Sequence, residues 1–152
     1  RLVVHHTAGS KDSTVEDIRR GHRARGFNDI GYHAVIRGDG SLHHGRSETL
    51  MGAHAGGANR DTLGVTVCGN FENEQPEPAQ RASFVAAQLV DALQRDDEGL
   101  IAACCTYLAD RLPELKQIKA RLLAAGFSVE LVFDKAYAKE VTLDFIPRPR
   151  HE

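Results

Sequence analysis

Short apolar runs of strand length alternate along this chain with segments that carry helix signals. Residues 2–4 and 63–68 are such runs, and residues 32–44 predict a β-hairpin that turns at Gly38-Asp39-Gly40. Segments with helical spacing lie between and after these strands. The interleaving predicts the α/β class, in the form of a single domain with a central mixed β-sheet flanked by helices.

Two helices are predicted within the first 96 residues. Ser13 and Glu16 have the spacing of a capping box, which predicts a helix over residues 14–25 that ends at Gly26. Pro76 and Pro78 open the second helix. Its apolar residues are expected to face the sheet and are Phe84, Val85, Leu89, Ala92 and Leu93.

The composition changes near residue 96. Residues 1–96 contain seven of the eight histidines and twelve of the fourteen glycines. We therefore divide the chain into a core, residues 1–96, and a divergent C-terminal segment, residues 97–152, that completes or extends the same domain. Spacing in the second part predicts helices over residues 100–112 and 114–125, the latter ended by Gly126, and strands over residues 129–133 and 141–146.

The charge balance gives no reason to expect a nucleic acid or a membrane as partner. The chain has 19 Lys and Arg residues against 21 Asp and Glu residues, with no run of five like charges. Its apolar stretches are well short of the roughly 20 residues that cross a bilayer. Cys68, Cys104 and Cys105 do not suit a paired disulfide framework, and we expect them to be reduced and buried.

Histidines end one predicted strand and also lie in a glycine-rich loop. His5 and His6 end the first strand, His33 lies in the hairpin, and His54 lies within residues 52–57. Neutral imidazole is the commonest metal ligand, and a strand end fixes its direction well. A single histidine carries little information, so the sequence around each one decides its meaning.

Four blocks that contain or flank these histidines follow one another along the chain. They are residues 3–9 (VVHHTAG), residues 26–33 (GFNDIGYH), residues 52–57 with 59–61 (GAHAGG and NRD), and residues 63–65 with 69–71 (LGV and GNF). Together, over about residues 1–95, they resemble the zinc-dependent N-acetylmuramoyl-L-alanine amidases. That family includes phage lysozymes of the amidase type and the peptidoglycan recognition proteins.

The resemblance implies a groove for the peptide stem of bacterial peptidoglycan. It implies hydrolysis of the amide between N-acetylmuramic acid and L-alanine, with zinc as the cofactor. By their match to the family motifs, His5 is a zinc ligand and Tyr32 is a catalytic tyrosine beside the metal. The same match makes His54 and Asn59 residues that bind substrate in the groove.

These residue types suit amide hydrolysis. Zinc polarises a carbonyl oxygen and lowers the pKa of a bound water to about 7. The phenol of Tyr32 can donate a hydrogen bond to the developing oxyanion. We expect His6 and His33 to support the site, and Arg60 or Arg46 to pair with a carboxylate of the stem peptide.

The later zinc ligands of the family have no full counterpart in this chain. In the family they follow the long helix, as a His at a strand end and then a Cys or Asp. After residue 96 the single histidine is His151, which we take as the candidate second ligand at the end of a displaced strand. The C-terminal segment is otherwise a replacement of the usual part, an insertion, or a segment that pairs with another chain.

Three functions remain open from the sequence. The leading one is a cell-wall amidase of prophage or bacterial origin, such as an endolysin. The second is a module of the same fold that binds peptidoglycan without cleaving it, because the late ligands are missing. The third is a metal-free hydrolase that uses Cys68 as its nucleophile.

Overall fold

A four-stranded mixed sheet forms the centre of the computed structural model, which describes residues 1–123 and 126–134. The strand order is β1 (Leu2–His6), β4 (Leu63–Val67), β2 (Ala34–Ile36) and β3 (Leu42–His44). β4 runs parallel to both of its neighbours, whereas β2 and β3 form the antiparallel hairpin. The α/β class, the mixed sheet and the hairpin are as the sequence predicts.

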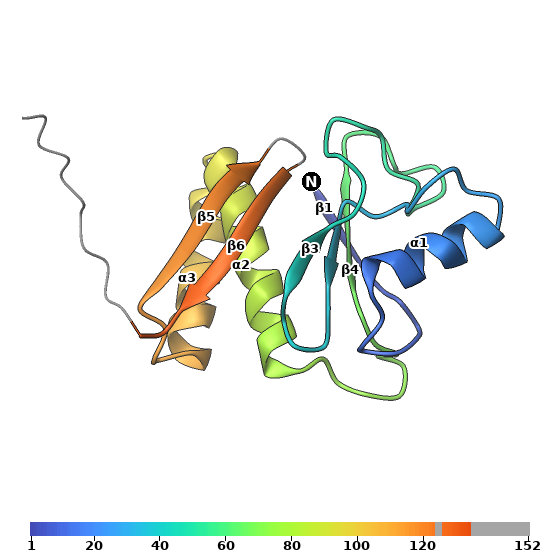
Figure 1. Ribbon diagram of the computed structural model, residues 1–152. Coiled ribbons are helices and arrows are strands. Elements are labelled where there is room, and N and C mark those ends of the chain that lie inside the picture. The colour runs from blue at the N-terminus through green and yellow to red at the C-terminus, as the bar shows by residue number, and fades with distance from the viewer. Residues whose placement is uncertain (124–125, 135–152) are drawn as a thin grey trace, which may run out of the picture.

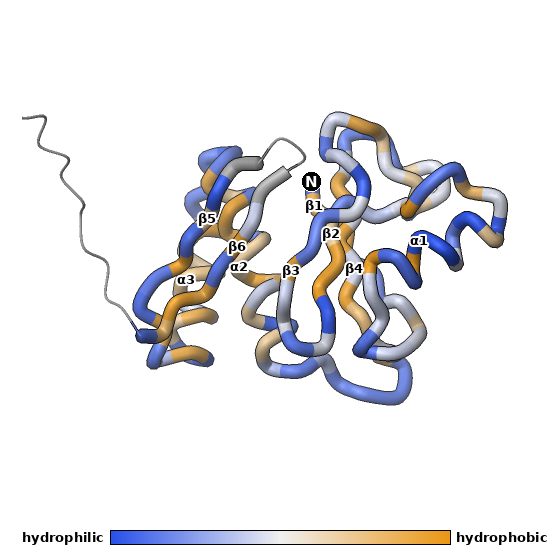
Figure 2. The backbone as a smooth tube through the Cα atoms, in the orientation of Figure 1, coloured by the Kyte–Doolittle hydropathy of each residue, from blue (hydrophilic) through white to orange (hydrophobic). Residues whose placement is uncertain are grey.

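Helices cover both faces of this sheet (Figure 1). α1 (Val15–Ala24) lies against one face and α2 (Pro78–Gln94) against the other. The central strands are hydrophobic along their length (Figure 2), as expected for strands buried on both sides. The α1 face buries a cluster built on Ile30, Val35 and Cys68, and the α2 face buries a cluster built on Ile36, Val65 and Val67.

The capping box of α1 lies one residue later than predicted. Thr14, not Ser13, is the N-cap, and its hydroxyl accepts a hydrogen bond from the backbone N–H of Asp17 (3.1 Å). The carboxylate of Asp17 accepts one from the backbone N–H of Thr14 (3.0 Å). Ser13 with Glu16 and Thr14 with Asp17 both have the three-residue spacing of a capping box. Spacing alone therefore could not show which pair caps the helix. Gly26 follows the helix with a φ of +89°, as its predicted role requires.

α2 begins where the two prolines predicted. Gln80, fully buried in its first turn, donates from its side-chain amide to the carbonyl of Cys68 (2.7 Å) and accepts from the backbone N–H of Glu77 (2.9 Å). Of the residues predicted to face the sheet, Phe84 packs on its strands, whereas Val85 and Leu89 pack in a cluster with Cys104 and Leu108 of the C-terminal segment, so their predicted position is wrong. The prediction for Leu93 is wrong as well, because Leu93 is 55% exposed and lies about 100° around the helix from the buried Ala92.

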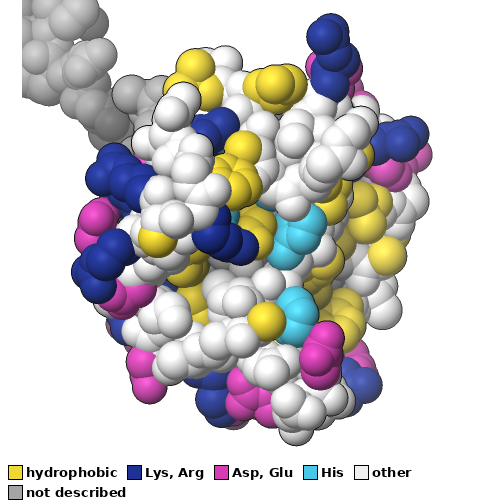
Figure 3. Space-filling view, turned by 90° about the vertical axis from the view of Figure 1, so that its right-hand side faces the viewer, with side chains coloured by type: hydrophobic (Ala, Val, Ile, Leu, Met, Phe, Trp, Pro, Cys, Tyr) yellow, Lys and Arg dark blue, Asp and Glu magenta, His cyan; other side chains and the backbone are white. Residues whose placement is uncertain are grey.

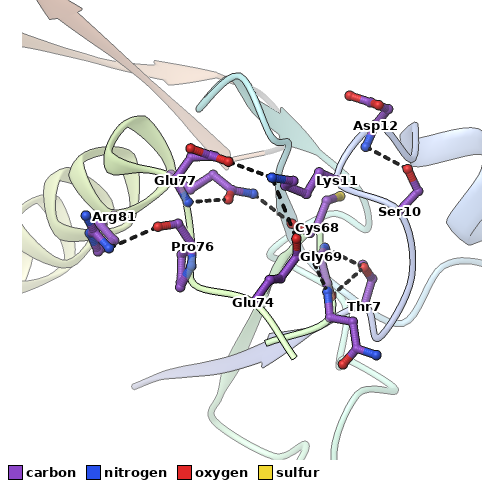
Figure 4. A network of polar contacts seen from close by, with 12 residues as sticks. Thr7, Ser10, Lys11, Asp12, Cys68, Gly69, Glu74, Pro76, Glu77 and Arg81 are labelled. Carbon is purple, nitrogen blue, oxygen red and sulfur yellow. Dashed lines mark hydrogen bonds and ion pairs between the residues drawn. The ribbon is translucent and has the colours of Figure 1, made fainter. Parts of the chain in front are cut away.

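The loop after β1 is tied to the start of α2 by a polar network (Figure 4). The ammonium of Lys11 contacts the carboxylates of Glu77 (2.6 Å) and Glu74 (3.6 Å). The hydrogen bond and the charge of Glu77 raise the pKa of Lys11. The hydroxyl of Thr7 accepts a hydrogen bond from the backbone N–H of Gly69 (3.0 Å). The Lys11 contacts thus tie the loop to the start of α2, and the Thr7–Gly69 contact holds the C-terminal ends of β1 and β4 together.

The C-terminal segment packs on α2. α3 (Glu98–Arg111) follows it, and the hairpin of β5 (Gln117–Leu123) and β6 (Gly126–Val132) lies against both helices (Figure 1). The helix predicted over residues 114–125 is therefore wrong, and Gly126 begins a strand instead of ending a helix.

Two further expectations for this segment differ from the structure or lie beyond it. Cys104 is buried as predicted, but Cys105 is exposed, so its predicted burial is wrong. The strand predicted over residues 141–146 and the candidate ligand His151 lie outside the described residues. In the part of the chain that the structure describes, no helix has the length and apolar character needed to cross a membrane.

Candidate functional site

Five aromatic side chains from four segments of the chain meet near the C-terminal end of β1. We call His5, His22, Tyr32, His33 and His54 the ring cluster. The ring centroid of His5 lies 5.4 Å from that of Tyr32 and 5.2 Å from that of His54, and the ring of His22 lies 5.2 Å from that of Tyr32. Figure 3 shows a face of the molecule on which histidine side chains reach the surface next to hydrophobic ones. The structure thus brings together His5, Tyr32 and His54, which the sequence predicts for the site.

His5 and His54 form a direct pair. Nε2 of His5 lies 3.1 Å from Nδ1 of His54, which is hydrogen-bond distance. Burial lowers the pKa of His5, and burial together with the charges of His5 and His33 lowers the pKa of His54. Both imidazoles are therefore neutral at neutral pH, and each has one N–H and one lone pair.

His22 and His33 are bound to the backbone. Nδ1 of His22 accepts a hydrogen bond from the backbone N–H of Gly31 (2.9 Å). Nδ1 of His33 accepts one from the backbone N–H of Gly64 (2.9 Å), and its Nε2 donates to the carbonyl of Leu50 (3.0 Å). Their geometry suits support of the site, as the sequence predicted for His33. His22 is not among the residues that the sequence analysis places at the site, and its bond to Gly31 was missed.

Two glycines leave room for these rings. A Cβ at Gly64 would overlap Cγ and Cδ2 of His54, and a Cβ at Gly52 would lie 2.5 Å from Cδ2 of His54 and 2.8 Å from Cε1 of His33. Real Cβ atoms do not approach that closely. Gly52 of the third sequence block and Gly64 of the fourth are therefore needed where the His54 ring packs against β4.

Asn59 holds the loop that carries His54. Its side-chain oxygen accepts hydrogen bonds from the backbone N–H groups of His54 and Ala55, both at 2.9 Å. Its predicted contact with substrate stays a prediction.

The two candidate arginines differ in their surroundings. Arg60 is exposed and lines a hollow of about 360 Å³ together with Asn59 and Met51. The guanidinium of Arg46 donates to the carbonyls of Ile30 (2.9 Å) and Met51 (2.7 Å), so it supports the backbone. Arg60 is the better candidate for a substrate carboxylate.

Cys68 does not suit the role of a nucleophile. Its side chain is fully buried, and its Sγ donates to the carbonyl of Ser13 (3.5 Å). Burial raises the pKa of its thiol to about 11. A nucleophilic cysteine needs its thiolate, so the structure opposes the third function considered from the sequence.

The described residues do not complete a metal site. Within residues 1–123 and 126–134, no group of three histidine, cysteine, aspartate or glutamate side chains is placed to hold a metal ion. The His5–His54 pair offers two ring nitrogens, whereas a catalytic zinc has three protein ligands. Nδ1 of His6 is occupied by a hydrogen bond from the backbone N–H of Phe71 (3.0 Å).

Comparison with known families agrees with the motifs. Residues 1–103 match the family described as N-acetylmuramoyl-L-alanine amidase. This chain belongs to that family. The match ends within α3, so it includes every residue of the ring cluster.

Relatives of two kinds resemble this amidase-family chain. The endolysin of Escherichia phage T7 is 37% identical over 83 residues, which are 55% of this chain and 53% of the endolysin. Peptidoglycan-recognition protein SC2 of Drosophila melanogaster is 36% identical over 101 residues, which are 61% of this chain and 54% of that protein. The chain thus spans about half the length of these curated relatives.

Solved structures of the same two kinds of protein resemble this chain. The N-acetylmuramoyl-L-alanine amidase LysC from Clostridium intestinale is 36% identical with a TM-score of 0.59, and the match covers 62% of this chain and 63% of LysC. Human PGRP-IBETAC in complex with glycosamyl muramyl pentapeptide is 26% identical with a TM-score of 0.54, and the match covers 62% of each chain. These likenesses confirm the predicted fold.

Proposed function

We propose that this chain is a peptidoglycan hydrolase that cleaves the amide between N-acetylmuramic acid and L-alanine and uses zinc. The observation that carries the proposal is the meeting of His5, Tyr32 and His54, which come from β1, the segment before β2 and the loop before β4. The relatives named endolysin and amidase support the activity, and the PGRP structure with a muramyl peptide supports the ligand.

Each residue has a separate task in this proposal. His5 and His151 would hold the zinc ion, and the described residues contribute His5 to its site. The phenol of Tyr32 donates a hydrogen bond to the oxyanion as the carbonyl is attacked. His54 and Asn59 bind substrate in the groove, and Arg60 pairs with a stem-peptide carboxylate. The division into a core, residues 1–96, and a C-terminal segment, residues 97–152, belongs to the same proposal.

The test is release of L-alanine-bearing peptides from purified peptidoglycan, with zinc and with a chelator. His5→Ala and Tyr32→Phe are expected to reduce release strongly. His43→Ala is the matched control, because His43 is an exposed histidine of β3 outside the ring cluster. No release by the unaltered chain in the presence of zinc would refute the hydrolase.

A module that binds peptidoglycan without cleaving it is the second candidate. It is favoured by the finding that the described residues hold no group of three metal donors. It predicts retention of the chain on insoluble peptidoglycan with less than roughly a tenth of an equivalent of zinc, since a catalytic site needs one bound ion. Bound zinc together with peptide release would refute it.

A further inference from the structure

The sheet is not fully covered beside β1. Val4 lies in this strand, at the edge of the sheet, and is 50% exposed. A hollow of about 470 Å³ lies next to it, and its apolar wall includes Val4, Phe71, Pro76 and Phe84. Apolar hollows of this size bind small organic molecules.

The two aromatic walls of this hollow are fixed by contacts of their own. The backbone N–H of Phe71 donates to Nδ1 of His6 (3.0 Å), and the rings of the two residues are stacked with their centroids 6.0 Å apart. Phe84 packs on the strands of the sheet. The apolar hollow is thus formed before any ligand binds, and binding needs little ordering of these side chains.

Arg81 borders the apolar hollow and also a second hollow, of about 480 Å³. The second hollow lies between the start of α2 and the end of α3, where Tyr107 and Arg111 line it. Nη1 of Arg81 donates to the carbonyl of Pro76 (3.0 Å), as Figure 4 shows, and this bond engages one of its three guanidinium nitrogens. Arg81 therefore joins the two hollows and keeps N–H donors for a ligand.

The lining of the two hollows is positively charged. Arg81 and Arg111 contribute two guanidinium groups, and none of the described residues in the lining is acidic. Nε of Arg111 lies 3.2 Å from a carboxylate oxygen of Asp110, but the two side chains are 69% and 70% exposed, so water screens that pair. Glu77, which precedes α2, is bound by Lys11 (2.6 Å). The charge of the lining thus favours an anionic group.

A phosphate group suits these donors. A guanidinium group binds phosphate oxygens through two parallel N–H groups. The three outer oxygens of a phosphate monoester can accept from both arginines and from the hydroxyl of Tyr107, whereas a carboxylate has two oxygens. An alkyl chain attached to this phosphate would enter the apolar hollow, because Arg81 borders both hollows.

We propose that the two hollows form one binding site for a small amphipathic phosphate, an alkyl chain that ends in a phosphate monoester. The chain lies against Phe71 and Phe84, and the phosphate lies between Arg81 and Arg111. This site goes beyond the proposed function. Its test does not involve hydrolysis of peptidoglycan, so the two can fail separately.

The test uses the full ¹⁵N-labelled chain at constant ionic strength. A chelating resin first removes any metal from His5, which also borders the apolar hollow. Three ligands are titrated: octyl phosphate at concentrations too low for micelles, inorganic phosphate, and octanol. Octyl phosphate should bind at least about 50-fold more tightly than inorganic phosphate or octanol, because each buried CH₂ group strengthens binding about fourfold and the arginines bind the phosphate. The backbone amide signals of Phe71, Ala82 and Leu112 should shift and saturate.

Variants separate the two ends of the ligand. Arg81→Gln and Arg111→Gln should each weaken the binding of octyl phosphate about 10-fold, since each removes hydrogen bonds to a charged group. Val4→Thr keeps the shape of the side chain, and it should weaken octyl phosphate about threefold and leave inorganic phosphate unchanged. Arg20→Gln is the matched control and should bind like the unaltered chain, because Arg20 is 73% exposed on α1 and lines neither hollow.

Three results would each overturn the proposal: no saturable shift with octyl phosphate, equal affinities for octyl phosphate and inorganic phosphate, or unchanged affinity in either arginine variant. The backbone amide signals of Gly31 and Gly64, which bond to His22 and His33, report whether each variant is folded.

Discussion

Gly64→Ala should displace the His54 ring without unfolding the protein. The new Cβ would overlap Cγ and Cδ2 of His54 and lie 2.9 Å from its Nδ1. Carbon atoms in contact are normally about 3.5–4.0 Å apart, so the ring must move by about 1 Å or more. The His5–His54 contact, now 3.1 Å, would then exceed hydrogen-bond distance.

The expected cost to stability is modest, because a side chain and not backbone has to yield. Overpacking of this kind costs about 1–3 kcal/mol, and we expect the lower end for Gly64→Ala since His54 is only half-buried. Urea denaturation measures that cost, and peptide release from peptidoglycan measures the loss at the site. Gly21→Ala is the control: nothing lies within 4 Å of its Cβ, and it should stabilise α1 by about 0.5–1 kcal/mol.

The result that would refute this reasoning is specific. If Gly64→Ala releases peptide at the rate of the unaltered chain and keeps the ring signals of His5 and His54, the packing of His54 against β4 does not position the pair.

Three further outcomes are expected. Gln80→Leu should lower the free energy of unfolding by roughly 1–3 kcal/mol in urea, because it leaves buried backbone groups without a partner, whereas Gln94→Leu on the exposed end of α2 should change it little. A thiol reagent should label the exposed Cys105 of the folded protein rapidly and spare the buried Cys68. Burial lowers the pKa of His22 below its unfolded value of about 6.5, so the unfolded chain binds the proton more readily. The resulting stability is present above pH 6.5 and is lost as the pH falls through the folded-state pKa. The urea midpoint should therefore drop from pH 7 to pH 5, and by less in His22→Asn.

The first half of the fold could be predicted because its signals are local. The Gly38-Asp39-Gly40 turn, the two prolines before α2 and the glycine after α1 each act on the few residues beside them. The segment from residue 114 to residue 125 has one such signal, the following Gly126, and it misled the prediction because Gly126 begins a strand. Leu115, Ile118 and Leu122 have helical spacing, while Ile118 and Leu122 also lie on one face of a strand. Hydrogen bonding to β6 decides in favour of a strand over a helix. Because β6 lies later in the sequence, the local pattern of residues 114–125 does not show this choice.

The candidate site was only partly accessible from the sequence. The sequence motifs predict that His5, Tyr32 and His54 belong to one site. The contact between the imidazoles of His5 and His54, however, depends on the path of the loop from Gly52 to Thr62. No pattern of residue types fixes that path. The same holds for His22, whose bond to Gly31 forms because α1 packs across the segment before β2.

The ring cluster and the described C-terminal residues lie on opposite sides of the sheet. The ring cluster lies on the side of α1, through the contact of His22 with Tyr32. α3 and the β5–β6 hairpin pack on α2, on the opposite side, through a cluster that includes Leu89, Cys104 and Leu108. Substitutions in that cluster act on the site only through α2 and the sheet. The described C-terminal residues thus stabilise the fold, and residues 5–64 build the ring cluster and its supports.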